Sequence, residues 1–109
     1  MRLKGNKVLS LLGLAKKAGK VVSGEFSTEA AVKSGKACMV IVSEEASWNT
    51  RKKFRDMCSW YNVPIFLYGG KEELGGCIGQ ELRASIAVTD PGFSGAIQRE
   101  LGNVDERRA

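Results

Sequence analysis

Three cysteines are the side chains of this sequence best suited to nucleophilic or metal chemistry. They are Cys38, Cys58 and Cys77, which form no C-x-x-C pair, and the chain has no histidine to complete a zinc site or to activate a thiolate. Their odd number also argues against a disulfide framework. Because each lies in an apolar stretch, we interpret them as small buried hydrophobic side chains, with a redox or nucleophilic role as the alternative.

Acidic residues are the second candidates for chemistry, because a pair of carboxylates can serve as general acid and base. Here they occur as adjacent pairs in predicted loops or exposed turns: Glu44-Glu45, Glu72-Glu73 and Asp105-Glu106. Acid–base catalysis needs groups that converge from separate elements. We therefore predict that the protein is not an enzyme, and a small hydrolase or nuclease is the weakest of the alternatives.

Glycine-rich stretches raise the possibility of a phosphate-binding loop. The segment GGKEELGG matches neither G-x-x-x-x-G-K-[ST] nor G-x-G-x-x-G, and the segment after the first predicted strand has one glycine, Gly24, followed by Glu25. Neither segment is a good cradle for a nucleotide phosphate. We predict no cofactor and no metal.

Positive charge is concentrated at one end of the sequence. The chain has a net charge of +5, and residues 1–36 carry eight basic and two acidic side chains, against nine basic and ten acidic in residues 37–109. A pI of about 9.3 is typical of proteins that bind nucleic acid. A basic surface built from the N-terminal third is therefore a candidate nucleic-acid interface, and the alternative is a solvated face that only aids solubility.

The elements that must position these residues follow from hydrophobic periodicity. A helical pattern covers residues 6–18, 24–35, 49–61, 71–78 and 91–101. A strand pattern covers residues 20–23, 37–42, 65–68 and 84–89. This alternation predicts a three-layer α/β/α sandwich around a mixed, mostly apolar central sheet of four strands.

The sequence predicts one domain over residues 1–103 and a polar tail over residues 104–109. We expect the third helix to open at Asn49 or Thr50, and the last helix to begin after Asp90 and to stop at Gly102. The start of the chain resembles an amphipathic helix rather than a signal peptide, and no stretch has the roughly 20 apolar residues that span a bilayer. These features predict a soluble, cytoplasmic protein without a membrane partner.

Four short motifs carry a resemblance to a known family. They are GLAKKAGK, S-x-N-T-x-K-K, KEELG and IAVTDPGF, and the similarity covers residues 4 to 101 without a large gap. Together they resemble the bacterial YlxQ branch of the ribosomal kink-turn-binding (L-seven-Ae) superfamily. The resemblance implies an α/β/α sandwich and binding to kink-turns in RNA.

The resemblance also implies two contact regions. In the family, the second helix begins with G-x-N-E-x-x-K, whose polar side chains read guanines. When the glycine of this motif is aligned with Gly24, this sequence has Phe26, Ser27 and Ala30 at the positions of the Asn, Glu and Lys. Ser27 retains one hydrogen-bonding group, whereas Phe26 and Ala30 supply neither the amide nor the cation. The second region is the loop after the last strand, here Val88, Thr89 and Asp90, with Val88 as the expected apolar contact.

The start of the second helix offers another way to bind RNA. Unpaired backbone N–H groups over residues 24–27 suit a phosphate, and Phe26 can stack on an unpaired base. The alternative places Phe26 in the core, at helical spacing with Ala30, Ala31 and Ser34. Because Glu25 and Asp90 repel phosphate, lysines must supply most of the attraction.

These observations predict a non-catalytic RNA-binding protein that is associated with the ribosome or assists RNA processing and acts as a monomer. We expect phosphate contacts from Lys16, Lys17, Lys20, Lys33 and Lys36. The alternative function is that of a protein-interaction module, which uses the same surface of the second helix, with Phe26 exposed, to bind a protein and does not bind RNA.

Overall fold

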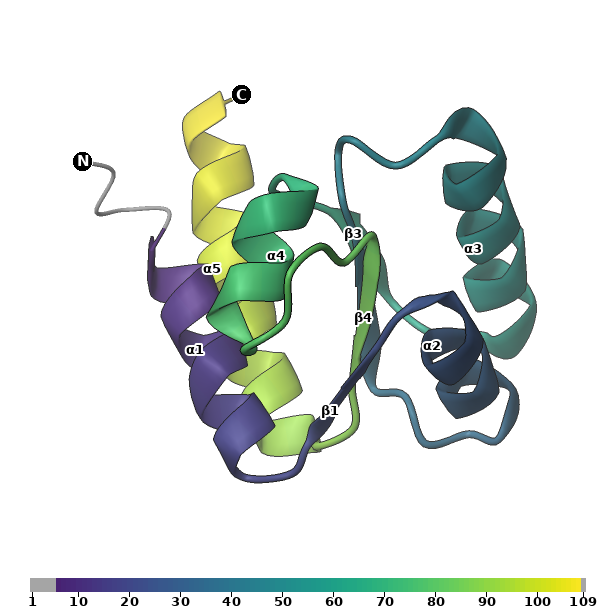
Figure 1. The fold of residues 1–109 in the computed structure, drawn as a ribbon, viewed down its shortest axis with the longest axis horizontal. Helices are drawn as coiled ribbons and strands as arrows, with labels where there is room; N and C mark the ends of the chain where they lie inside the picture. Colours follow the sequence, from purple (N-terminus) through teal and green to yellow (C-terminus); the bar gives the residue numbers. More distant parts are fainter. Residues whose placement is uncertain (1–5, 109) are drawn as a thin grey trace.

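The computed structural model describes residues 6–108, in which helices and strands alternate as the periodicity predicts (Figure 1). The elements are α1 (Asn6–Lys17), β1 (Val21–Ser23), α2 (Glu25–Lys33), β2 (Met39–Val42), α3 (Trp48–Tyr61), β3 (Ile65–Leu67), α4 (Lys71–Cys77), β4 (Ser85–Val88) and α5 (Pro91–Arg108). The observed strands are up to two residues shorter than the predicted apolar runs.

The four strands form one mixed sheet in the order β1-β4-β2-β3. Strand β4 runs antiparallel to both β1 and β2, and β3 runs parallel to β2. All residues of the two central strands, β2 and β4, are buried. This arrangement confirms the predicted mixed sheet with an apolar centre, and it leaves β1 and β3 as the two edges.

Helices cover both faces of the sheet. Helices α1, α4 and α5 lie on one side, and α2 and α3 lie on the other (Figure 1). Along β2 the side chains alternate, because Met39 and Ile41 pack with the first group of helices while Val40 and Val42 pack with the second. The two resulting cores confirm the three-layer sandwich.

Two predicted helix boundaries are wrong. Helix α3 begins at Trp48, because the Ser47 hydroxyl caps it by accepting a hydrogen bond of 3.1 Å from the Thr50 N–H, so neither Asn49 nor Thr50 is the cap. Helix α5 continues through Gly102 to Arg108 and takes in most of the predicted tail. Gly102 does not adopt the left-handed conformation that ends a helix. Within residues 6–108, no helix is long and apolar enough to cross a membrane.

Candidate functional site

Four of the predicted lysines lie at the same end of the sheet. Here the Thr89 N–H donates to the Lys20 carbonyl at 2.9 Å, and the Cys38 N–H donates to the Val88 carbonyl at 2.7 Å. These bonds join the start of β1, the end of β4 and the loop before β2. In Figure 1 the end of α1 and the starts of β1 and α5 meet there, at the bottom of the molecule. We call the four residues the lysine cluster: Lys16, Lys17, Lys20 and Lys36.

A glycine turn places the lysines of α1 in this cluster. Gly19 has a φ of 76°, which lets the Lys20 N–H donate to the Ala15 carbonyl at 2.8 Å and turns the chain directly into β1. Lys16 and Lys17 therefore occupy the last turn of α1. All four lysines of the cluster are exposed, and none forms an ion pair with another residue that the structure describes. Their positive charge is thus available to a ligand.

The start of α2 lies at the opposite end of β1. Gly24 has a φ of 91°, and its N–H donates to the carbonyl of Ser85, the first residue of β4, at 3.0 Å. Phe26 follows with 84% of its surface exposed. The buried residues of α2 are Thr28, Ala31 and Val32.

The interpretation of Phe26 as a core aromatic is therefore wrong. Phe26 is exposed because of the register of the helix. Residues 28, 31 and 32 form the stripe that faces the core, which leaves Phe26, Ala30 and Ser34 exposed. Ala31 is the one member of the proposed inward set that is buried. The alternative in which Phe26 is available to a partner remains.

The loop between α4 and β4 is the neighbour of Gly24 that the sequence reasoning missed. Arg83 Nε donates to Ser23 Oγ at 2.9 Å, and Arg83 Nη2 donates to Gln80 Oε1 at 3.0 Å. Leu82 is 58% exposed beside it. The sequence offered only a weak indication of this contact, because Leu82 and Arg83 lie between two predicted elements and Arg83 is 60 residues from Ser23.

The β4–α5 loop, in contrast, lies at the lysine end of the sheet rather than beside the start of α2. Val88 is fully buried in the core, so its side chain cannot be the apolar contact that the resemblance implied. Asp90 accepts a hydrogen bond of 2.9 Å from the Phe93 N–H and so caps α5. Thr89 and Asp90 are half-buried next to Lys20. The structure therefore separates the two predicted contact regions by the length of β1.

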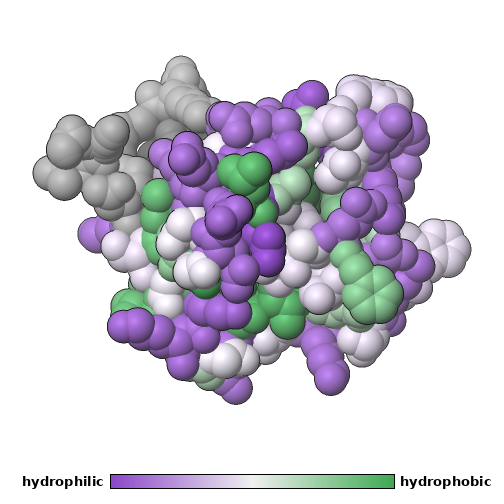
Figure 2. Space-filling view, in the orientation of Figure 1, coloured by the Kyte–Doolittle hydropathy of each residue, from purple (hydrophilic) through white to green (hydrophobic). Residues whose placement is uncertain are grey.

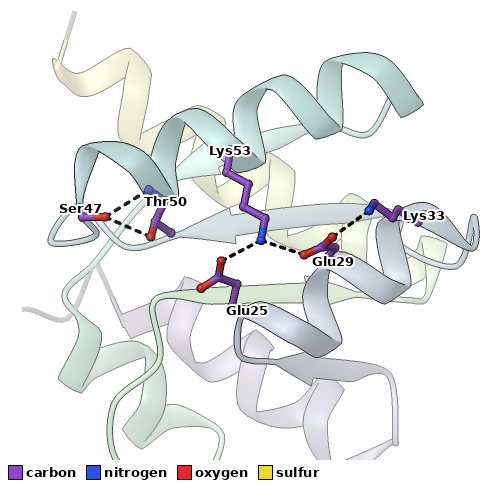
Figure 3. Close-up of polar contacts among 6 residues, drawn as sticks. All are labelled: Glu25, Glu29, Lys33, Ser47, Thr50 and Lys53. Carbon is purple, nitrogen blue, oxygen red and sulfur yellow. Dashed lines mark hydrogen bonds and ion pairs between the residues drawn. The ribbon is translucent and has the colours of Figure 1, made fainter.

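A network of ion pairs links α2 to α3 (Figure 3). Lys53 of α3 lies between Glu25 and Glu29, with its Nζ 2.8 Å from a carboxylate oxygen of each, and Lys33 also pairs with Glu29 at 2.8 Å. The pairing offsets the negative charge of Glu25 at the start of α2. It also occupies Lys33, which is therefore less available to phosphate than the lysine cluster.

Glu29 makes the stability of this link depend on pH. The hydrogen bond from Lys33, followed by that from Lys53, lowers the pKa of Glu29 from 4.5 to about 2. Because the pKa is lower in the folded state, the stabilisation is complete above about 4.5 and is lost as the pH falls towards 2.

Replacing Glu29 by glutamine should therefore lower the free energy of unfolding at pH 7, and the difference from the wild type should shrink below about pH 4.5 and be lost as the pH falls through about 2. Urea unfolding at several pH values measures both. Asp56→Asn is the control, because Asp56 pairs with Lys52 within a single helix. A Glu29→Gln deficit that persists unchanged at pH 2 would exclude the charge of Glu29 as its cause.

Burial disfavours thiolate chemistry at two of the three cysteines. Burial raises the pKa of the Cys58 and Cys77 thiols to about 11, so both are protonated at neutral pH and are poor nucleophiles. Cys58 is fully buried, as predicted, whereas Cys38 and Cys77 are half-buried. Among the side chains that the structure describes, no three acidic or cysteine residues come together as a metal site.

The surface on the side of β1 is polar. In Figure 2, which has the orientation of Figure 1, hydrophilic residues and residues of intermediate hydropathy together cover most of the described surface, and hydrophobic residues appear as separate smaller areas. Such a face, with free lysines at one end and an exposed aromatic ring at the other, suits a polyanionic partner better than an apolar one.

Solved structures of other proteins share the fold. A Bacillus halodurans C protein of unknown function superposes with a TM-score of 0.85 and 38% identity, over 88% of this chain and 97% of that one. The Giardia lamblia 15.5kD RNA binding protein superposes with a TM-score of 0.79 over 97% of this chain and 91% of that one, at 17% identity. At that identity the second similarity supports the fold alone.

Relatives of similar length are found by sequence. The RNA-binding protein YlxQ of Bacillus subtilis (strain 168) is 42% identical over 92 residues, which cover 84% of this chain and 92% of the relative. The large ribosomal subunit protein eL30 of Sulfurisphaera tokodaii is 36% identical over 78 residues, or 70% and 74% of the two chains. Residues 6–98 match the model of the family to which ribosomal proteins L7Ae, L30e and S12e and Gadd45 belong. The chain therefore belongs to the ribosomal protein L7Ae/L30e/S12e/Gadd45 family.

Proposed function

We propose that this protein binds structured RNA without catalysing a reaction, and that the lysine cluster makes the phosphate contacts. The observation that carries the proposal is the gathering of Lys16, Lys17, Lys20 and Lys36 at one end of the sheet, with no ion-pair partner in the described part of the chain. The similarity to relatives named as RNA-binding and ribosomal proteins supports the same class of partner.

The proposed surface extends along edge strand β1. Lys20 and Gly24 are four positions apart along extended chain, or about 13 Å, so a single folded RNA can touch both ends. Arg83, held by Ser23, adds a cation close to Gly24. The cations position the RNA through its backbone, and the start of α2 contributes shape selection.

Recognition by shape rather than by guanine edges follows from the residues at the start of α2. Phe26 and Ala30 have no side-chain donor or acceptor for a base edge, whereas an exposed aromatic ring can stack on any unpaired base. We propose that Phe26 stacks on a base that a bulge or kink leaves unpaired.

Chemical acetylation tests the proposed phosphate contacts. RNA should protect all four residues of the lysine cluster from acetylation, because their ammonium groups face phosphate, and should leave Lys33 and Lys52 at their rates in the free protein. Mass spectrometry of digests with and without RNA measures each rate. Protection that is equal over the whole surface, or strongest at Lys52, would contradict the proposal.

Phe26→Ala should weaken binding to a kink-turn RNA by about 1–3 kcal/mol, the usual value of one stacked base. Binding to a matched plain duplex, which offers no unpaired base, should not change. Trp60→Ala on α3 is the control, since Trp60 is 80% exposed and lies outside the proposed surface. Because both rings are exposed, neither change should alter the midpoint of thermal unfolding by more than about 2 °C. An equal loss of affinity for duplex and kink-turn would rule out stacking.

A further inference from the structure

Strand β3 forms the edge of the sheet opposite β1, and part of its backbone points outward. The Val40 N–H donates to the Pro64 carbonyl at 2.9 Å, and the Tyr68 N–H donates to the Val42 carbonyl at 3.0 Å. In a parallel ladder the residues that bond the neighbouring strand alternate. Residues 64, 66 and 68 therefore face β2, and the N–H and C=O groups of Ile65 and Leu67 face away from the sheet.

A pocket of about 280 Å³ lies between this edge and helix α3. Its lining includes the apolar side chains of Val42, Ile65 and Leu67, and Leu67 is 47% exposed. Arg51 and Arg55, one turn apart on α3, line the same pocket. The edge thus combines outward-facing backbone groups, an apolar wall and two cations.

The two arginines lack a counter-charge. Neither forms an ion pair with another residue of the described chain, and Arg51 Nε is buried there without a hydrogen-bond partner. A buried donor with no acceptor is costly, and a guanidinium is best satisfied by a carboxylate that bonds two of its N–H groups. An acidic group that bonds the outer N–H groups of both guanidinium ions would supply the counter-charge that the two arginines lack.

We infer that an extended acidic segment of a partner protein binds here by adding a strand to β3. The backbone of such a segment pairs with Ile65 and Leu67, and alternate side chains fall on the α3 side of the sheet. There an aspartate or glutamate bonds Arg51 and Arg55, and the aliphatic part of the side chain two residues along the segment covers Leu67. A polypeptide fits better than RNA because the outward N–H and C=O groups match a second strand and the wall of the pocket is apolar.

Because β3 and β1 are opposite edges of the sheet, this surface is independent of the proposed RNA surface. The protein would then hold RNA at one edge and a protein at the other.

The probe is a synthetic peptide of about six residues in which valine and glutamate alternate, so that the register that puts glutamate on the α3 side places it over the arginines. In NMR titrations of the full chain, the peptide should shift the amide signals of Ile65 and Leu67 and slow their hydrogen exchange. Arg51→Glu with Arg55→Glu should weaken binding at least about tenfold, since each replaces an attraction by a repulsion. Lys17→Glu with Lys20→Glu, which changes the net charge equally, should leave peptide binding intact.

A second pair of variants separates strand addition from simple charge attraction, and it also serves if the arginine variant does not fold. Leu67→Pro removes one outward N–H and none that faces β2, so an edge strand tolerates it. It should abolish binding, whereas Leu67→Ala should retain most of it. The inference is overturned if the peptide leaves the amides of Ile65 and Leu67 unaffected at millimolar concentration, if Leu67→Pro binds as well as Leu67→Ala, or if a short single-stranded RNA shifts these amides and the peptide does not.

Discussion

Replacing Lys17 and Lys20 together by glutamate is expected to weaken binding to structured RNA by about 100-fold or more. A hydrogen bond to a charged group contributes about 1.5–3 kcal/mol, and the change removes two such bonds and adds two repulsions. Both side chains are exposed and form no ion pair with a described residue, so the fold should not suffer. Fluorescence anisotropy with a labelled RNA at about 0.1 M salt measures the loss.

The matched control carries the same change of net charge at the opposite edge of the sheet. Arg51→Glu with Arg55→Glu should reduce RNA affinity only slightly, through the weaker overall field of the protein. An equal loss in both double variants would mean that RNA responds to net charge alone and that the lysine cluster has no special role. Circular dichroism of both variants confirms that each is folded.

Gly75→Ala is expected to lower the free energy of unfolding by about 1–3 kcal/mol, as overpacking in a tight interior usually does. A Cβ atom on Gly75 would overlap the backbone of Glu81, with Leu82 N only 3.0 Å away. Because both contacts are backbone, the α4–β4 loop has to move as a unit. The move carries Arg83 away from Ser23, so RNA affinity should fall as well.

Gly76→Ala is the matched control, since a Cβ there meets no atom within 4 Å. It should leave RNA affinity unchanged and, because alanine favours a helix, raise stability by at most about 1 kcal/mol. Urea unfolding and RNA titration of the two variants give both quantities. If Gly75→Ala were as stable as Gly76→Ala, the loop would not be held against α4 as the structure indicates.

Local sequence patterns predicted most of the fold. The continuous apolar runs at β2 and β4 indicated buried central strands, and Gly19 ended α1 as its position predicted. The prediction at Gly102 was wrong because a glycine ends a helix only if it adopts a positive φ, and Glu106, Arg107 and Arg108 beyond it favour a helix. At α2 the large apolar side chain of Phe26 set the predicted register, and the buried positions of Thr28 and Val32 were missed.

The candidate site could be predicted only in part. The density of lysines in the N-terminal third predicted a basic surface, and the turn at Gly19 places Lys16 and Lys17 near Lys20. The pairing of Lys53 with Glu25 and the contact of Arg83 with Ser23 join residues 28 and 60 positions apart, and no local pattern encodes them. Similarly, β4 inserts between β1 and β2, which places Ser85 rather than Val88 beside Gly24.

The salt dependence of RNA binding tests the central claim most directly. If the four lysines of the cluster and Arg83 contact phosphates, log affinity should fall with log salt at a slope of about −3.5 to −4.5. The Lys17→Glu, Lys20→Glu variant should show a slope shallower by at least about 1.5, while Arg51→Glu with Arg55→Glu should keep the wild-type slope. A wild-type slope near zero, or a slope that the lysine variant leaves unchanged, would contradict phosphate binding by the lysine cluster.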